Sequence, residues 1–134
     1  MSISIDTNQE KFSIINKTKG RLPSLSFVLM KEKVLGKDYD LSLVFIDEKE
    51  IHELNKTHRK VDSATDILSF PLDEKSGEIF ICLSKTKEMA KEFDREYKNF
   101  LAFLFIHGLV HLLGFDHGDK MEKEEEKYRK IFNI

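Results

Sequence analysis

The sequence has 134 residues, of which 40% are hydrophobic and 34% charged, and its formal net charge is −2 at pH 7. This balance fits one folded domain over residues 1–134 and excludes a disordered chain, which would carry fewer hydrophobic residues and a larger net charge. The single cysteine excludes an internal disulfide and favours a reducing, cytoplasmic setting, and the N-terminus lacks the pattern of a secretory signal.

In the first third of the chain we expect one strand and one helix. Residues 2–5 alternate polar and apolar side chains, as a short edge strand does. Apolar residues at helical spacing follow Pro23, and Gly36 would end that helix. Residues 8–20 fit neither pattern. Seven basic residues and one acidic residue lie between positions 11 and 37, which permits contact with a polyanion such as RNA or simply gives a solvated surface.

The middle of the chain predicts three strands and two helices. Residues 40–46 are apolar and β-prone. Asp47 then offers an N-cap, with Glu50 as its capping-box partner, for a helix that should end near Lys56. Residues 59–66 are polar and predict a loop.

Two more strands should follow that loop. Residues 67–70 form a short strand that Pro71 would end, and residues 78–83 form the next one after a turn. Ser84 offers an N-cap for a helix that reaches about Arg95.

The C-terminal third predicts two helices. Residues 99–113 are apolar nearly all round the helix, as is typical of a helix at the centre of a core. The whole apolar run is shorter than the roughly 20 residues of a membrane span and contains two histidines. Gly114 suits the end of this helix. Asp119 and Glu122 predict a capping box for a last, mostly charged helix, and the mixed order of strands and helices favours an α+β or α/β fold.

The candidate chemistry lies in residues 107–117, HGLVHLLGFDH. On a helix, His107 and His111 lie one turn apart on the same face, so both imidazoles can reach one ion. Gly114 lets the chain turn, which would bring His117 round as a third ligand. Three neutral histidines leave one coordination position open, as in catalytic zinc sites, and such an ion lowers the pKa of bound water to about 7.

Other interpretations of these residues remain. Each histidine alone is more often an ordinary core or surface residue. A purely structural ion would take a fourth protein ligand, with Cys82 or Asp116 as candidates, and Asp116 is otherwise suited to orienting a ligating histidine. The H-E-x-x-H motif of metalloproteases carries its catalytic glutamate at the position of Gly108, so peptide hydrolysis is disfavoured.

The segment 107–117 resembles the H-G-x-x-H-L-x-G-x-D-H signature of the YbeY family of bacterial rRNA maturation factors. A second block agrees with it: Arg59 and Asp62, followed by residues 65–71, resemble the arginine loop and the T-D-x-L-S-F-P strand of that family. The resemblance runs from about Leu41 to the C-terminus, and the blocks stand in the right order.

The resemblance implies an α+β fold with a small mixed sheet of about four strands, packed by helices around a central buried helix that carries the metal ligands. It implies a metal-dependent, single-strand-specific endoribonuclease that acts in 16S rRNA 3′-end maturation and ribosome quality control. One divalent ion per chain, zinc, is the implied cofactor. Ribosomal RNA and the 30S ribosomal subunit are the implied partners, with no membrane and no identified ribosomal protein or GTPase.

Under this interpretation the three histidines hold the ion, and Arg59 binds phosphodiester oxygens as negative charge builds on them. Lys56 and Lys60 would follow the RNA backbone, although each is more simply an exposed lysine. Two alternatives are a metal-dependent peptide or amide hydrolase and a non-catalytic ribosome-assembly factor with a structural metal.

Overall fold

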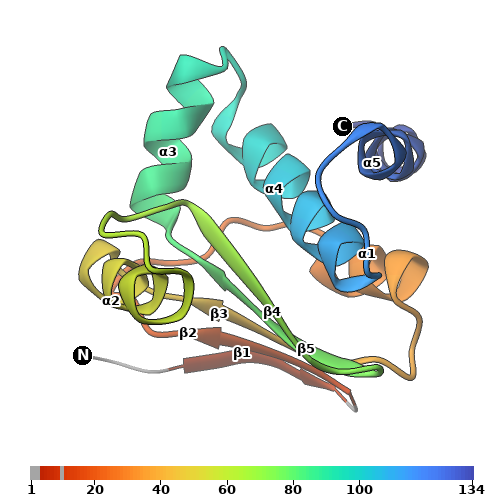
Figure 1. Ribbon diagram of the computed structural model, residues 1–134, viewed down its shortest axis with the longest axis horizontal. Helices are drawn as coiled ribbons and strands as arrows, with labels where there is room; N and C mark the ends of the chain where they lie inside the picture. The colour runs from red at the N-terminus through yellow and green to blue at the C-terminus, as the bar shows by residue number, and fades with distance from the viewer. Residues whose placement is uncertain (1–3, 10) are drawn as a thin grey trace.

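The computed structural model describes residues 4–9 and 11–134, with side chains described from residue 11 onward (Figure 1). The expected strand at residues 2–5 therefore lies partly outside the described residues. The elements in chain order are β1 (Ser4–Gln9), β2 (Phe12–Asn16), α1 (Phe27–Val34), β3 (Asp40–Phe45), α2 (Glu48–Arg59), β4 (Ile67–Asp73), β5 (Ser76–Ile81), α3 (Leu83–Glu92), α4 (Tyr97–Leu112) and α5 (Asp119–Phe132).

The strands form one mixed sheet in the order β1-β2-β3-β5-β4. The neighbours β2, β3 and β5 are parallel, whereas β1 and β4 run antiparallel at the two edges. The expected α+β class with a small mixed sheet is confirmed. In the described residues the sheet has five strands, and the one that sequence patterns did not assign is β2, whose parallel partner β3 lies more than twenty residues further along the chain.

The sheet buries both of its faces because apolar side chains alternate along its central strand. Leu41 and Leu43 of β3 belong to the larger core, which α1 and α4 share. Val44 and the following Ile46 face the opposite side, where Ile51 of α2 covers them. This alternation is the period-two pattern of a strand buried on both faces.

Helix α4 lies at the centre of the helical layer, between α3 and α5 (Figure 1). Its 16 residues are buried nearly all round, and its Phe105 meets Phe27 of α1 edge-on with centroids 5.2 Å apart. The expectation of a central buried helix is confirmed. No helix in the described part of the chain is long and apolar enough to cross a membrane.

Helix α2 begins as predicted, because the Asp47 side chain accepts a hydrogen bond from the backbone N–H of Glu50 at 2.9 Å. It continues past Lys56, however, and ends at Arg59, where Lys60 adopts a left-handed conformation with φ of 61°. Arg59 is therefore the last residue of a helix and does not belong to the loop predicted for it.

Further boundaries differ from the predictions, at the end of β4 and at the starts of α3 and α5. Pro71 does not end β4, because β4 is an edge strand and its outward backbone positions need no N–H donor. Helix α3 begins one residue before Ser84, and α5 begins at Asp119 after Gly118, so neither Ser84 nor Asp119 acts as the N-cap.

Candidate functional site

A pocket of about 190 Å³ lies where the end of α2, the first half of β4 and helix α4 meet. The residues that line it are Arg59, Ile67, Leu68, Ser69, His107, His111 and His117. All four residues that the sequence singled out for catalysis thus line one cavity, although Arg59 lies almost fifty positions before the first histidine. The fold joins them because β4 runs alongside α4.

The three imidazoles approach one another closely. The ring centroids of His107 and His117 are 5.2 Å apart, and those of His111 and His117 are 5.8 Å apart, with interplanar angles of 25° and 23°. Three imidazoles on one tetrahedral ion at about 2.1 Å place their centroids about 5 Å apart, so the spacing suits a common ligand. As the side chains stand, no three His, Cys, Asp or Glu residues among those described form a group compact enough to hold an ion. His117 is exposed in a turn, which leaves its side chain room to rotate.

Two of the histidines have their second ring nitrogen fixed by an acceptor. His107 Nδ1 donates to the Glu125 carboxylate at 2.9 Å, and His111 Nδ1 donates to the Phe115 carbonyl oxygen at 3.0 Å. The Phe115 carbonyl and an ionised Glu125 can only accept, so Nδ1 carries the proton in both rings, and Nε2 of each neutral ring keeps a free lone pair. Metal-binding histidines show this arrangement, which fits the donor set to a divalent ion.

Glu125 was not identified from the sequence. It is nearly buried and comes from α5, a helix whose surface is otherwise strongly charged. One signal was available: Met121, Glu125, Tyr128 and Phe132 share one helix face, so a carboxylate interrupts an apolar stripe. Asp116, the residue proposed for this orienting role, is exposed, and the second nitrogens of His107 and His111 are taken by other groups, so its role stays a prediction for His117 alone.

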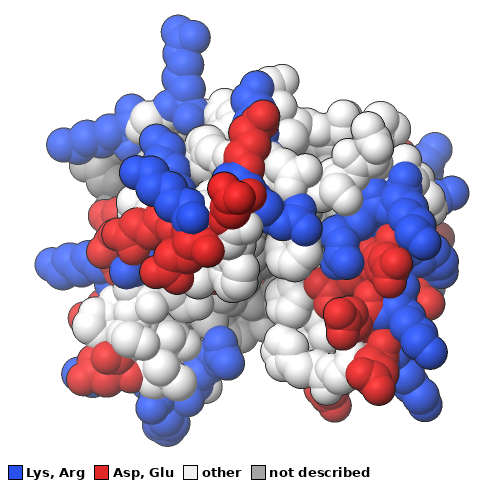
Figure 2. All heavy atoms as spheres, turned by 90° about the horizontal axis from the view of Figure 1, so that it is seen from above, with Lys and Arg blue, Asp and Glu red and all other residues white. Residues whose placement is uncertain are grey.

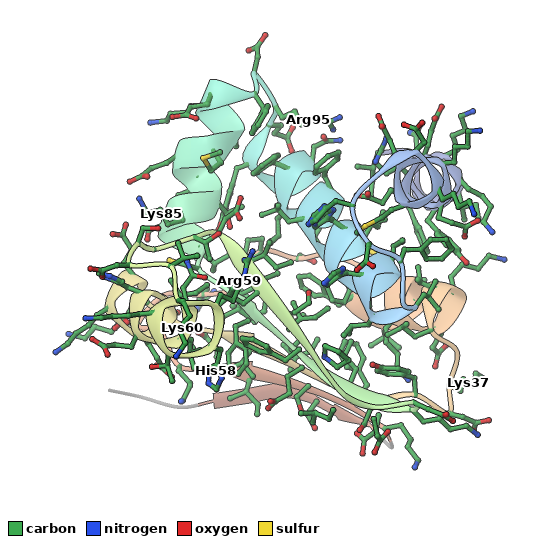
Figure 3. The ribbon with its side chains drawn as sticks, in the orientation of Figure 1. Lys37, His58, Arg59, Lys60, Lys85 and Arg95 are labelled. Atoms are coloured by element: carbon green, nitrogen blue, oxygen red, sulfur yellow. The ribbon has the colours of Figure 1, made fainter. Side chains whose placement is uncertain are left out.

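Arg59 reaches the pocket from the C-terminal end of α2. Figure 3 shows it on the side of α2 that faces α4. A guanidinium presents several donors in one plane and suits the binding of two phosphate oxygens at once. Lys56 and Lys60 are exposed and do not line this pocket. Lys56 instead lies near Asp62, whose pKa is lowered by its hydrogen bond with His52 and further by the charge of Lys56.

Gly108 lies between the two helical histidines, where α4 touches the sheet. A Cβ atom there would come within 3.0 Å of both the Ile67 side chain and the Ser69 hydroxyl, and within 3.1 Å of Ile79. The position thus has no room for the glutamate that metalloproteases carry after their first histidine. The glycine is explained by close packing of helix on sheet.

Cys82 is fully buried in the apolar cluster that α2 covers, and its sulfur contacts the Ser84 hydroxyl at 3.3 Å. This cluster is on the opposite side of the sheet from α4, so Cys82 cannot be a fourth ligand to an ion held by the histidines. Its role is that of a small buried residue, as sequence reasoning preferred.

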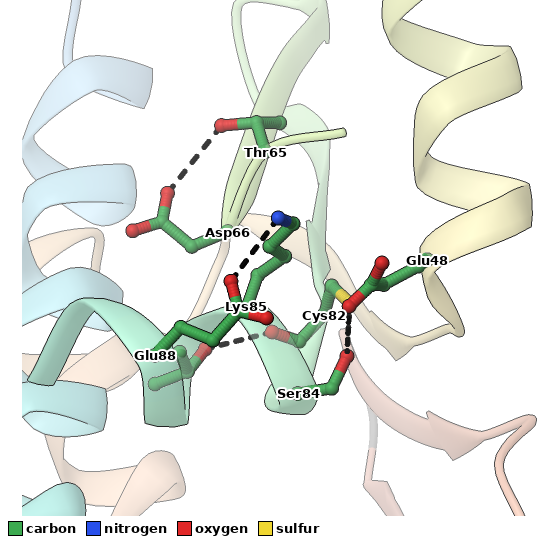
Figure 4. A network of polar contacts seen from close by, with 8 residues as sticks. Glu48, Thr65, Asp66, Cys82, Ser84, Lys85 and Glu88 are labelled. Carbon is green, nitrogen blue, oxygen red and sulfur yellow. Dashed lines mark hydrogen bonds and ion pairs between the residues drawn. The ribbon is translucent and has the colours of Figure 1, made fainter. Parts of the chain in front are cut away.

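Asp66 is a half-buried carboxyl group at the start of β4. Figure 4 shows it directed toward α4 and away from the Lys85 ammonium, with the Thr65 hydroxyl donating to it at 3.4 Å. Burial raises its pKa above the ordinary value, while hydrogen bonds from backbone N–H groups and the hydroxyl oppose that rise. It interacts electrostatically with His107 and lines a second pocket that this histidine also borders.

Charge around the site is mixed. In Figure 2, acidic and basic side chains alternate over α5 at the right, and uncharged surface lies between them and the charged groups at the left. Pairs such as Lys127 with Glu124 and Lys130 with Glu126 neutralise much of the charge of α5 locally. The one Arg or Lys among the described residues that line the candidate site is Arg59.

Comparison with known proteins gives matches over nearly the whole chain. The family model described as Endoribonuclease YbeY matches residues 4–133. An Endoribonuclease YbeY of Clostridium botulinum is 33% identical over 163 aligned positions, which cover 98% of each chain. One from Finegoldia magna is 35% identical, with 92% of this chain and 85% of the relative covered. The solution structure of the Thermotoga maritima protein TM1509 superposes with a TM-score of 0.59 at 31% identity, covering 80% of this chain and 79% of that one.

Proposed function

This chain belongs to the YbeY endoribonuclease family, and we propose that it cuts single-stranded RNA during ribosomal RNA maturation with one divalent ion, zinc, held by His107, His111 and His117. Residues 4–40, which carry no readable motif, also fall within the family match. The whole chain, residues 1–134, then acts as one metal-dependent hydrolase domain.

The observation that carries this proposal is the pocket shared by Arg59 and the three histidines. Phosphodiester cleavage gathers negative charge on the oxygens around phosphorus, and a site that stabilises it needs fixed positive charge at that point. A guanidinium from α2 and a cation-binding set from α4 and the following turn meet this need from two sides.

The ion would supply Lewis-acid chemistry toward the phosphodiester and toward water. The residues of the chain have separate tasks. Glu125 and the Phe115 carbonyl hold His107 and His111 in the tautomer with a free Nε2. Arg59 binds and orients the phosphate, and the Ser69 hydroxyl offers a neutral donor at the wall of the same pocket.

The two alternatives have less support. A peptide or amide hydrolase that follows the metalloprotease pattern needs a carboxylate after the first histidine, and the packing around Gly108 leaves no space for one. A factor with a purely structural ion needs a fourth protein ligand, and the buried position of Cys82 excludes one of the two candidates.

The test is a cleavage assay on single-stranded and duplex oligoribonucleotides, beside metal analysis of the purified protein. We expect cleavage of the single strand to stop with chelator and to return with zinc. Arg59→Lys, which keeps the charge but loses the planar donors, should lower kcat by about 100- to 1,000-fold. His111→Ala should lose both metal and cleavage.

His58→Ala is the matched control, because His58 lies one position before Arg59 and packs on Phe70 outside the pocket. It should cleave like the native chain. Cleavage that continues after complete removal of metal would refute the role of the ion. Turnover of an amide substrate that is unchanged by substitution of Arg59 would favour the amide hydrolase. A lower melting temperature of His111→Ala, with no hydrolytic activity in the native chain, would favour the assembly factor with a structural ion.

A further inference from the structure

A second, larger pocket of about 450 Å³ adjoins the histidines on the other side of His107, between α3, α4 and the start of β4. This volume lies within the usual range for small-ligand sites. Phe93, Phe100 and Phe103 supply its aromatic wall, and Arg95 and Asp66 supply polar groups. His107 and Ile67 line both this pocket and the candidate catalytic pocket, so the two pockets are neighbours.

The aromatic wall is a row of nearly parallel rings. Phe93 and Phe100 have centroids 5.7 Å apart at 24°, and Phe100 and Phe103 have centroids 5.8 Å apart at 12°. Phe100 is buried, but Phe93 at the open end of the row is 59% exposed. An exposed phenylalanine at the end of a stack offers a flat face to which another planar ring can add.

Positive charge surrounds the other end of the row. The guanidinium carbons of Arg95 and Arg129 lie 4.7 Å and 5.0 Å from the centroid of the Phe103 ring. Arg95 is further fixed by a hydrogen bond from Nη1 to the Asn99 side chain, and Figure 3 shows it beside the first turns of α4. Guanidinium groups held over an aromatic ring keep donors free for phosphate.

We propose that this pocket holds one unpaired nucleobase of the RNA strand, next to the phosphodiester bound at Arg59 and the histidines. The proposal rests on the function proposed above and extends it. The base stacks on Phe93, the Asp66 carboxyl group accepts from an N–H on the edge of the base, and Arg95 and Arg129 bind the adjoining phosphates. An aromatic platform beside cations is the usual composition of single-strand sites.

This pocket also gives a physical reason for preferring single strands. Every RNA base has at least one N–H on its Watson–Crick edge, but in a duplex that group is paired and both ring faces are stacked. Only a base that has left the helix can offer its face to Phe93 and its edge to Asp66. An apolar peptide side chain would fill the volume without using the arginines, so charge complementarity favours RNA.

The experiment measures binding of a fluorescein-labelled single-stranded oligoribonucleotide to the full chain in chelator, and its cleavage in zinc. A series of strands carries one abasic nucleotide at successive positions. Phe93→Ala should weaken binding by about 5- to 150-fold, since stacking one base contributes about 1–3 kcal/mol. Phe93→Trp should restore it. Leu29→Ala removes a residue of similar exposure, 61%, on α1 and should have no effect.

In the native chain, one abasic position should cause a loss similar to that of Phe93→Ala, and the two losses should not add. The base pocket would be overturned if Phe93→Ala bound the strand like the native chain. It would also be overturned if the abasic nucleotide weakened binding equally in the native chain and in Phe93→Ala. Either result leaves the proposed function intact. If Phe93→Ala weakens binding as expected but the native chain does not cleave the strand, the proposed function alone is refuted. A native chain that neither binds nor cuts single strands would overturn both proposals.

Discussion

Replacing Glu125 by alanine should weaken zinc binding by about 10- to 100-fold without unfolding the protein. The Glu125 side chain is only 9% exposed and accepts from His107 Nδ1 at 2.9 Å, so solvent screens this bond little. A hydrogen bond to a charged group contributes about 1.5–3 kcal/mol, and loss of such a partner from a metal-binding histidine typically costs about 10- to 100-fold in affinity. These two ranges agree, because a tenfold change in affinity corresponds to about 1.4 kcal/mol.

The assay is competition for zinc against a chromophoric chelator, with circular dichroism to show that each variant is folded. Glu125→Gln keeps a side-chain oxygen that can accept from His107 and should lose less than the alanine variant. Glu126→Ala removes the same charge from the exposed face of α5, where Glu126 pairs with Lys130, and should bind zinc like the native chain. If folded Glu125→Ala binds zinc as tightly as the native chain, His107 is not oriented for an ion by this carboxylate.

Two further predictions concern stability. Gly108→Ala should lower the free energy of unfolding by about 1 kcal/mol, because overpacking of about 1–3 kcal/mol exceeds the helix-propensity gain of up to about 1 kcal/mol. Urea denaturation checks this result against Gly20→Ala, whose added methyl meets no atom within 4 Å, and equal stability of Gly108→Ala and the native chain would contradict it. Asp66→Asn should stabilise the protein at neutral pH, since burial raises the pKa of Asp66 above 3.8 and penalises the ionised form. The native chain regains this stability as the pH falls through the raised pKa, so the difference between the two proteins should vanish below pH 3.8, and melting curves across this range that stay parallel would refute the assignment.

Local patterns predicted the histidines well because their geometry is local. His107 and His111 are joined by one helical turn, and Gly114, with φ of 102°, turns the chain so that His117 returns to them. The central position of α4 also followed from its composition, since a helix that is apolar nearly all round is stable only inside a core. Whether an ion completes this set stays a prediction.

Element boundaries and strands that depend on residues far apart in the chain could not be predicted from local sequence patterns. Arg59 was expected in a loop because residues 59–66 are polar. No glycine marks the true end of α2, where a lysine, Lys60, takes the left-handed conformation. Pro71 was expected to end a strand because proline cannot donate a hydrogen bond, but strand order makes β4 an edge strand. Strand β2 has too little alternation to be recognised alone, and its pairing with β3 is what makes it a strand.

The partly exposed residues in the inner turns of α4 form one line along the helix, and the residues of the proposed chemistry lie on it. Only every fourth residue of its inner turns is partly exposed: Asn99, Phe103, His107 and His111. This line runs from the residue that fixes Arg95, through the ring that both arginines cover, to the two histidines. A half-buried imidazole is stable only with a partner, and the partners come from α5 and from the turn before it. Docking of α5 therefore completes the core around Met121 and fixes His107 in the same step, so an ion that needs His107 in place should also stabilise the docked position of α5.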